Sequence, residues 1–392
     1  MNYHPTLRSL RLFYFFSFGA LGSLFPFLPL LLHKRGLGPS QIGWIMMVIP
    51  FANVVIPPIW GFAADAYRIR LPLLRLAATG SALTCLLLLT QHGFFATLAV
   101  VALFSLFRAP LTSLADAASV ASLDGRSHEF SRIRVFGSVG FGLFVATLGW
   151  LDATDHPSLL IASTAVVYLL ATATTLSLST PSTVSKTGMS SDVRRVLGRP
   201  SVLVFLAMSA VYYAGHAIFD VYFGLRMASL GLGDSVVGAG WAIGIASEIM
   251  VLLLAPRFFR FVRMEIWLTV CAVAAALRWL GIAALSCADA LLALQSLHGI
   301  TFGLWYLSLV TFVQTRADEN SRTSLQAIAL SCTGIGSSFA SVLGGNLLSH
   351  HGARTPFHMA AVCAGIAAFG YAMLAITSRN QNQPHRDISS SE

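Results

Sequence analysis

The stretch Gly36-Leu37-Gly38-Pro39-Ser40-Gln41-Ile42-Gly43 decides the fold, because the chain repeats it as Gly231-Leu232-Gly233-Asp234-Ser235-Val236-Val237-Gly238. A tryptophan follows each copy closely, at Trp44 and at Trp241, and each copy precedes a long apolar run. The copies begin 195 positions apart in a chain of 392 residues, which is almost half of its length. The repeat therefore predicts two copies of one membrane unit, an arrangement with which many carriers expose a central site alternately.

The composition agrees with a membrane protein. Hydrophobic residues make up 56% of the chain and charged residues 10%, less than half the charged share of a typical soluble domain. A helix needs about 20 apolar residues to cross the bilayer core, and twelve such runs can be marked. They lie near 12–32, 41–64, 71–91, 94–122, 133–152, 158–180, 200–227, 235–256, 264–286, 289–313, 325–349 and 356–378. A barrel is excluded, because its strands alternate over about ten residues. We predict an all-α integral membrane protein with twelve transmembrane helices in two pseudo-symmetric six-helix halves.

The domain organisation follows from where the apolar runs stop. We expect an N-terminal half at 1–180, a linker at 181–199, a C-terminal half at 200–378 and a polar tail at 379–392. The linker is rich in Ser and Thr and then basic, which suits a flexible connection, and 192–197 is expected to form a short surface helix. The first run is too long for a typical signal core and lies within the repeat, so we expect it to remain as a span. Ser40 and Ser235 are expected to cap the second span of each half.

The basic residues predict the orientation. With the N-terminus in the cytoplasm, eighteen of the twenty-five Lys and Arg fall in cytoplasmic segments, as the positive-inside rule requires. We therefore expect a multi-pass protein of the cell inner (plasma) membrane with both termini cytoplasmic. The net charge of +9 is then an orientation signal, and no nucleic-acid partner is expected.

Several other classes of protein find no support in the sequence. The five cysteines lie in or beside apolar runs without metal-ligand spacing, so no metal and no cofactor is expected. There is no HExxH motif and no nucleophile elbow, so an enzyme is not expected. A sensor would normally carry a soluble output domain, and none is visible. The expected partners are a small-molecule substrate, a proton and the lipid bilayer, and the chain is expected to act as a monomer.

Twelve spans, a basic central linker and both ends inside resemble the major facilitator superfamily over nearly the whole chain. The loop after the second span resembles the signature of that superfamily through Gly61, Asp65, Arg68 and Arg70. The resemblance implies a conformational-switch loop, in which the glycine lets helices approach and the charges favour one open state. The copy departs from the signature, because Ala66 and Arg68 stand where a basic residue and a glycine are usual.

The start of the fifth span points to a narrower group. The segment 131–140, Ser-Arg-Ile-Arg-Val-Phe-Gly-Ser-Val-Gly, resembles the corresponding segment of lactose permease-like and phenylpropionate permease-like proton symporters. The resemblance implies that Arg134 pairs with an acid eighteen residues earlier at the substrate site, and that acid is Asp116.

The second half carries further parts of this resemblance. Arg278 and His298 stand where the lactose carrier has its polar network, and Asp220 and Glu248 stand where it has acids. Two positions depart: Thr301 replaces the acid that carries the proton in that carrier, and Thr333 replaces its lysine in the eleventh span. The coupling site therefore cannot be carried over unchanged.

The same residues stand out without any family, because an ionisable side chain inside a bilayer costs a few kcal/mol and usually faces a cavity or a partner. Asp116 and Arg134 lie in adjacent antiparallel spans, so an ion pair is expected. The pair either only fixes two helices or opens to bind substrate, and we favour substrate binding. Arg108 lies two residues before Pro110, near an expected helix bend, where it attracts an anionic substrate or anchors Asp116.

A second group is expected in the C-terminal half. Glu248, Arg278 and His298 lie at similar depth and are predicted to handle the proton, since a carboxyl or an imidazole can take it up and release it; the alternative is a static buried network. His216 and Asp220 lie four apart on one helix face, where they form a second relay, line the substrate path or only hydrogen-bond each other. Tyr212, Tyr213 and Trp305 either stack on a ring of the substrate or pack in the core.

These residues together predict a secondary active transporter. We expect proton-coupled symport of a small organic solute, either a sugar such as lactose or an aromatic carboxylate such as phenylpropionate. The substrate would be bound by Asp116, Arg134, Arg108, His216 and Asp220. A nucleoside:proton symporter and a proton-coupled efflux antiporter remain alternatives, with a membrane sensor as the alternative outside transport. The fifth span has no proline, whereas antiporters of the superfamily usually have a Gly-Pro element there, and this favours uptake.

Overall fold

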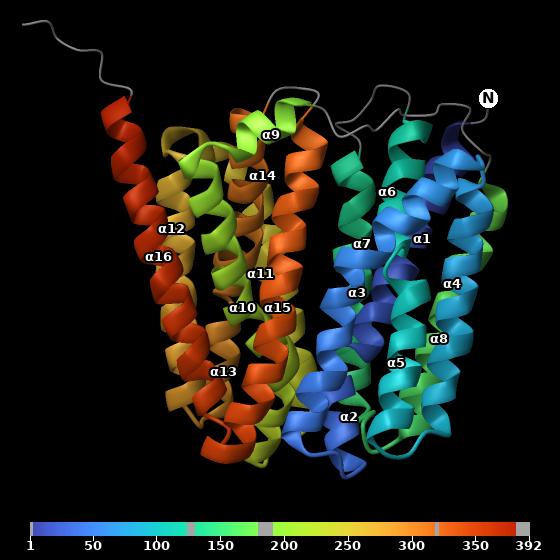
Figure 1. The fold of residues 1–392 in the computed structure, drawn as a ribbon. Coiled ribbons are helices and arrows are strands. Elements are labelled where there is room, and N and C mark those ends of the chain that lie inside the picture. Colours follow the sequence, from blue (N-terminus) through green and yellow to red (C-terminus); the bar gives the residue numbers. More distant parts are fainter. Residues whose placement is uncertain (1–2, 124–129, 179–190, 318–320, 382–392) are drawn as a thin grey trace, which may run out of the picture.

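The computed structural model describes residues 3–123, 130–178, 191–317 and 321–381. Within these ranges, twelve helices are long and apolar enough to cross a membrane, so the predicted number of spans is confirmed. Figure 1 shows the helices standing side by side in two bundles, with the start of α1 and the end of α16 at the same end of the molecule. We call that end the termini face and the other end the opposite face.

One bundle, the N-half, consists of eight helices. They are α1 (Tyr3–Leu24), α2 (Leu28–Lys34), α3 (Pro39–Ala66), α4 (Arg70–Leu86), α5 (Phe94–Arg108), α6 (Leu111–Ser122), α7 (Phe130–Trp150) and α8 (Pro157–Thr174). The first span combines α1 with α2, and the fourth combines α5 with α6. Single 3-10 turns extend α4 at Leu87–Leu89 and α8 at Thr175–Ser177.

The other bundle, the C-half, follows a short surface helix. That helix is α9 (Ser191–Leu197), which confirms the helix expected at 192–197; residues 181–190 of the linker lie outside the described ranges. The C-half comprises α10 (Pro200–Ser229), α11 (Asp234–Phe258), α12 (Met264–Ala284), α13 (Ala288–Gln295), a π-helix η5 (Gly299–Leu304), α14 (Trp305–Arg316), α15 (Arg322–His351) and α16 (Thr355–Gln381), with a 3-10 turn at Phe259–Phe261.

The sequence repeat has the same backbone in both halves. Gly36 and Gly231 both have positive φ, 84° and 74°, a conformation that favours glycine because it has no Cβ. Gly38 and Gly233 are the N-caps of α3 and α11 and have extended backbones. The expectation that Ser40 and Ser235 cap these helices is wrong, because the N-cap lies two residues earlier in each.

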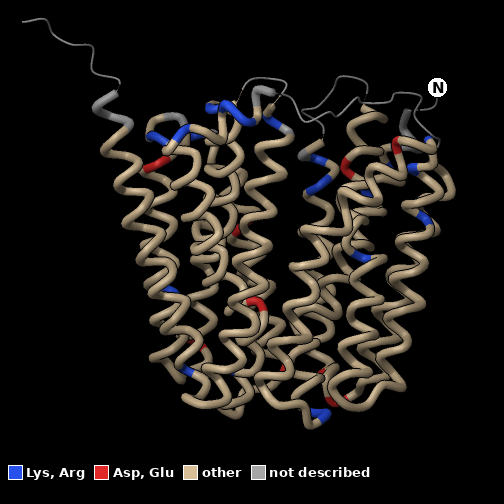
Figure 2. The backbone as a smooth tube through the Cα atoms, viewed as in Figure 1, with Lys and Arg blue, Asp and Glu red and all other residues tan. Residues whose placement is uncertain are grey.

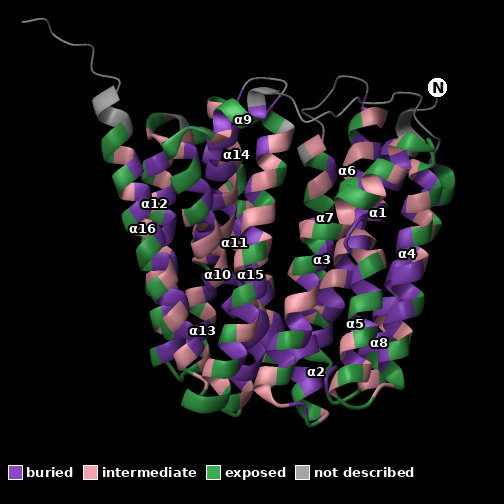
Figure 3. Ribbon diagram, viewed as in Figure 1, coloured by how far each residue is buried: buried purple, intermediate pink, exposed green. Residues whose placement is uncertain are grey.

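Small residues let the helices pack closely, as membrane helices do where hydrophobicity alone cannot drive association. A Cβ at Gly140 of α7 would lie 2.0 Å from the carbonyl oxygen of Phe15 on α1, and a Cβ at Gly336 of α15 would lie 2.2 Å from that of Ala210 on α10. Exposed residues run along the helices at both outer edges of the molecule (Figure 3). Many are large hydrophobic side chains such as Phe95 and Trp150, which suits a surface in contact with lipid.

The two halves touch through α3 with α15 and through α7 with α11. Toward the opposite face these contacts reach the backbone: a Cβ at Gly149 would lie 2.8 Å from the Cα of Gly238, and one at Gly43 would lie 2.5 Å from the carbonyl oxygen of Ser341. Figure 2 shows most Lys and Arg residues gathered at the termini face. The halves are therefore closed against each other at the face that carries fewer basic residues.

Candidate functional site

The N-half contributes an ion pair from α6 and α7. Arg134 Nη1 lies 2.9 Å from Asp116 Oδ2, so the predicted pair is confirmed. Tyr14 of α1 donates a hydrogen bond of 2.5 Å to the other carboxylate oxygen, and the Arg134 guanidinium lies 5.9 Å from the ring centre of Phe18. The Asp116 and Arg134 side chains remain 31% and 37% exposed. The pair is thus held by its own half and still open to a ligand.

The C-half contributes a buried arginine with neutral partners. Arg278 of α12 is fully buried. It donates hydrogen bonds to Gln295 Oε1 at 2.6 Å and Thr301 Oγ1 at 3.0 Å, and its third partner is His298 Nδ1 at 3.1 Å. Because a guanidinium can only donate, Nδ1 of His298 must accept and carries no proton in this arrangement. His298 can therefore become charged only if its bond to Arg278 is broken.

Aromatic rings and a π-helix complete the surroundings of Arg278. Its guanidinium lies 4.4 Å from the ring centre of Phe219 and 4.7 Å from that of Trp279, which stabilises a desolvated cation. Thr301 lies within the π-helix and takes a hydrogen bond on its carbonyl from the Tyr212 hydroxyl. Short π-helices are frequent at functional sites. Here the π-helix brings His298 and Thr301 to the same guanidinium.

Two acids predicted inside the spans of the C-half lack bonded partners in the described ranges. Neither Asp220 of α10 nor Glu248 of α11 makes a hydrogen bond or an ion pair with any residue in the described ranges. Glu248 packs its Cγ against Gly303, where an added Cβ would lie 3.1 Å away. The structure thus brings Arg278 and His298 together, and it places Glu248 against the π-helix.

His216 lies one turn before Asp220 and does not bond to it. It is 2% exposed, and among the described residues neither ring nitrogen has a hydrogen-bond partner. The alternative of a hydrogen bond between His216 and Asp220 is therefore wrong. Its ring lies 5.0 Å from that of Tyr212 and 5.2 Å from that of Trp279. Tyr212 in turn stacks on Trp305 at 4.9 Å, and both are fully buried, so these two rings pack in the core.

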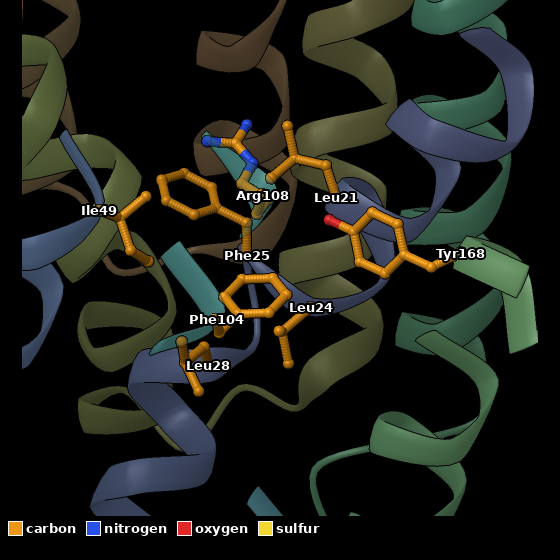
Figure 4. A pocket seen from close by; sticks show the side chains of 8 residues that line it. All are labelled: Leu21, Leu24, Phe25, Leu28, Ile49, Phe104, Arg108 and Tyr168. Atoms are coloured by element: carbon orange, nitrogen blue, oxygen red, sulfur yellow. The ribbon is translucent and has the colours of Figure 1, made fainter. Parts of the chain in front are cut away.

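Arg108 is the last residue of α5, and Ala109 and Pro110 separate it from α6, which confirms the predicted bend. Its Nη1 donates a hydrogen bond of 3.1 Å to Asn53 Oδ1 of α3. It forms no ion pair with a carboxylate in the described ranges, so Arg108 does not anchor Asp116. Figure 4 shows the guanidinium beside an apolar pocket. The other lining residues are Leu21, Leu24, Phe25, Leu28, Ile49, Phe104 and Tyr168.

The predicted switch loop makes only one of its expected contacts. Arg70 pairs with Asp65 at 2.6 Å, while Arg68 is exposed and has a positive φ of 57°. A Cβ at Gly61 would meet no atom within 4 Å. The expectation that Gly61 permits a close helix approach is therefore wrong in this structure, since the space beside it is open.

A polar cluster that was not predicted from the sequence joins the halves at the opposite face. The backbone N–H and the hydroxyl of Thr154 donate to the two oxygens of Asp234, at 2.7 and 2.8 Å. Lys34 Nζ donates to Thr154 Oγ1 at 2.6 Å and pairs with Asp155 at 2.7 Å. Asp234 is 2% exposed. A signal was present, because Asp234 is charged where the first copy of the repeat has Pro39.

Aromatic rings also cross between the halves. Trp241 of the C-half lies 6.5 Å from Phe25, which follows α1, and 5.5 Å from Phe141 of α7, measured between ring centres. Trp241, which the sequence marks only as part of the repeat, lies midway between Asp234 and Glu248 along α11.

Two bundles of helices long and apolar enough to span a membrane, each with ionisable side chains inside its spans, define a multi-pass membrane protein. The chain belongs to the MFS_1 like family, whose model matches residues 7–359. It is 26% identical to a maltose permease of Geobacillus stearothermophilus over 381 residues, 95% of each chain. It is also 26% identical to a "Probable 3-phenylpropionic acid transporter" of Escherichia coli over 322 residues, 79% of this chain and 82% of that one.

A solved structure shares the fold. The nucleoside transporter NupG superimposes with a TM-score of 0.85 at 18% identity, covering 94% of this chain and 99% of that one. The predicted superfamily and fold class are thereby confirmed. These are the family and fold of transporters, which are not enzymes.

Proposed function

We propose that this protein is a proton-coupled symporter that takes up a small organic solute by alternating access. Glu248 carries the proposal: it is a carboxyl inside a span, 9% exposed, with no bonded partner among the described residues, and it packs against Gly303 of the π-helix. A carboxyl in such a place can bind a proton at little cost and release it when a cation approaches. Arg278 and His298 assist from the same half, and a break in their hydrogen bond would free His298 to accept a proton.

The substrate is bound between the halves. Asp116 and Arg134 are partly exposed and offer acceptors and donors from one side. Arg108 offers a further guanidinium, and Asp220 and His216 line the other side. The names of the relatives support a sugar, an aromatic acid or a nucleoside as cargo. The loop that shifts between the two open states contains Gly61, Asp65, Arg68 and Arg70.

The orientation belongs to the same proposal. The gathering of basic residues at the termini face (Figure 2) supports placing both termini in the cytoplasm of the cell, with the protein acting as a monomer in the inner membrane. The aromatic contacts and the polar cluster then close the outer side. Efflux by proton antiport is the second candidate, and the direction of pH-driven flux distinguishes it from uptake.

The test is transport in right-side-out vesicles with labelled maltose, phenylpropionate and uridine, each with and without an imposed pH gradient. The Glu248→Gln variant should lose accumulation while it still exchanges external for preloaded substrate, because only the proton step is removed. Asp289→Asn is the matched control, since Asp289 is an exposed acid near the opposite face, and it should accumulate normally. Equal loss of exchange and accumulation in Glu248→Gln would contradict a proton-carrying role.

A further inference from the structure

The three arginines predicted to lie inside the spans differ in how their charge is compensated. Arg134 is paired with Asp116, and Arg278 has three hydrogen-bond partners and the nearby charge of Asp220. Arg108 has only neutral partners in the described ranges, the amide of Asn53 and the hydroxyl of Tyr168. An uncompensated cation within a membrane is costly. Such a cation is therefore a candidate for pairing with a charge on the cargo.

Arg108 also lies where a cargo would touch both halves. Phe25, which lines the pocket beside it (Figure 4), contacts Trp241 of the C-half. Asn53 precedes Val54, whose side chain would lie 2.5 Å from a Cβ at Gly334 of α15. The guanidinium is thus at the boundary between the halves, next to an apolar surface.

The free donors of Arg108 and the apolar side chains beside it favour a ligand with a carboxylate. A guanidinium presents five N–H donors in a planar fork that matches two carboxylate oxygens, and its contacts with Asn53 and Tyr168 leave further donors for a ligand. The adjoining side chains of Leu21, Phe25 and Ile49 suit an apolar body rather than a hydroxyl-rich one. A solute with a single carboxylate on an apolar body fits both features.

The charges predicted inside the spans bear on the stoichiometry. With the carboxyls ionised and His298 neutral, Asp116, Asp220 and Glu248 equal Arg108, Arg134 and Arg278 in number, so this set carries no net charge. Three other charged residues within spans, Arg226, Asp234 and Glu265, have partners of their own. Loading one proton onto the set leaves one net positive charge, which a monocarboxylate cancels and a neutral cargo does not. A monoanion therefore keeps this set neutral both when empty and when loaded.

We propose that the cargo is an amphipathic monocarboxylate bound by Arg108, and that one anion and one proton move together without net charge. This inference rests on the proposed proton symport and names its substrate class. It has a direct electrical consequence: a pH gradient drives uptake and a membrane potential does not.

The experiment uses the purified full chain in proteoliposomes. Labelled phenylpropionate is offered under an imposed pH gradient, and separately under a potassium diffusion potential set with valinomycin. Protein-free liposomes correct for passive entry of the undissociated acid. We expect uptake with the pH gradient and no change with the potential. Arg108→Gln should reduce uptake by about 10- to 100-fold, the value of one or two charge-assisted hydrogen bonds; Arg108→Lys should fall between, and Arg354→Gln, at an exposed arginine, should match the unmodified protein.

The outcomes separate this inference from the proposed function. If maltose or uridine accumulates and the potential drives that uptake, the symport stands and the carboxylate assignment is overturned. The carboxylate assignment is also overturned if cinnamate and phenylpropionate neither enter nor compete with the transported compound. If no compound responds to the pH gradient, the symport itself fails. If Arg108→Gln transports as well as the unmodified protein, Arg108 is not the carboxylate site.

Discussion

The charged groups of the two halves are built in opposite ways. In the N-half, Asp116 and Arg134 satisfy each other while about a third of each side chain stays exposed. In the C-half, Arg278 is sealed among neutral partners, and Glu248 and Asp220 have no bonded partner in the part of the chain that the structure describes. The N-half therefore holds a preformed pair that a ligand can reach, and the C-half holds acids whose protonation breaks no existing bond.

This difference distinguishes a charge that must keep its hydrogen bonds for stability from charges that can change partners. A buried polar group is expensive unless its hydrogen bonds are made, and Arg278 meets that requirement with Gln295, Thr301 and His298. A half-exposed ion pair contributes little to stability, so Asp116 and Arg134 can separate at low cost. The two arginines should thus respond very differently to substitution.

The largest effect is expected at Arg278. Arg278→Ala removes a fully buried side chain and leaves three polar groups without their donor, which should lower the free energy of unfolding by about 3–5 kcal/mol. Arg134→Gln should lower it by no more than about 1 kcal/mol. Thermal unfolding of both variants in the same detergent measures the contrast. Similar melting temperatures for the two variants would mean that the network of Arg278 is not the structural element we describe.

The next largest effect is expected for the ion pair of the N-half. Asp116→Asn keeps the shape of the side chain but leaves Arg134 without its counter-charge. Because the pair is partly exposed, we expect the melting temperature to change little while the initial rate of uptake falls at least about tenfold, as for loss of a charged contact. Initial rates and thermal unfolding are measured on one preparation. A parallel fall in both would show that the pair fixes the helices and has no role in binding.

Much of the fold was readable from the sequence for a clear physical reason. A bilayer imposes one length on every span, so composition alone located twelve helices, and the repeat at Gly36 and Gly231 marked equivalent turns with positive φ. The pair of Asp116 and Arg134 was predictable because adjacent spans fix which residues share a depth.

The side-chain arrangement of the site could not be predicted from the sequence. The depth of a residue in the membrane does not specify which way its helix is rotated about its own axis. Glu248 was grouped with Arg278 and His298, but it makes no bond to either and packs against Gly303. Gln295 was overlooked, although its amide is what satisfies Arg278. The orientation of Glu248 and the partners of Arg278 depend on contacts between helices, and a single sequence gives little information about such contacts.

A smaller effect is expected at Tyr14, which fixes the orientation of Asp116. Tyr14→Phe keeps the buried ring and removes the 2.5 Å hydrogen bond to Asp116 Oδ1, so the free energy of unfolding should fall by about 1 kcal/mol. Asp116 would then turn more freely, and the KM for uptake should rise several-fold with little change in kcat. Tyr371→Phe is the matched control, because Tyr371 is a buried tyrosine of α16 that hydrogen-bonds Ser209 in the core of the C-half; its KM should not change. A change in kcat alone would place Tyr14 in a conformational step instead of binding.

The smallest effect concerns the polar cluster that joins the halves at the opposite face. The hydrogen bond from Lys34 and its positive charge hold the pKa of Asp155 below its ordinary value of 3.8. A carboxyl with a lowered pKa contributes to the closed state above its ordinary pKa, and that contribution is lost as the pH falls through the lowered value. Closure at this face should therefore not change between about pH 8 and about pH 5.

Spin labels test this at two exposed sites in different halves, the native Cys287 and a cysteine introduced by His92→Cys, with the other cysteines replaced. The distance distribution should stay constant over that range and broaden only below the ordinary pKa of Asp155. Asp155→Asn should broaden it slightly at neutral pH and remove the response to acid. Broadening between about pH 8 and about pH 5 in the unmodified protein would show that the Asp155 carboxyl does not control closure at this face.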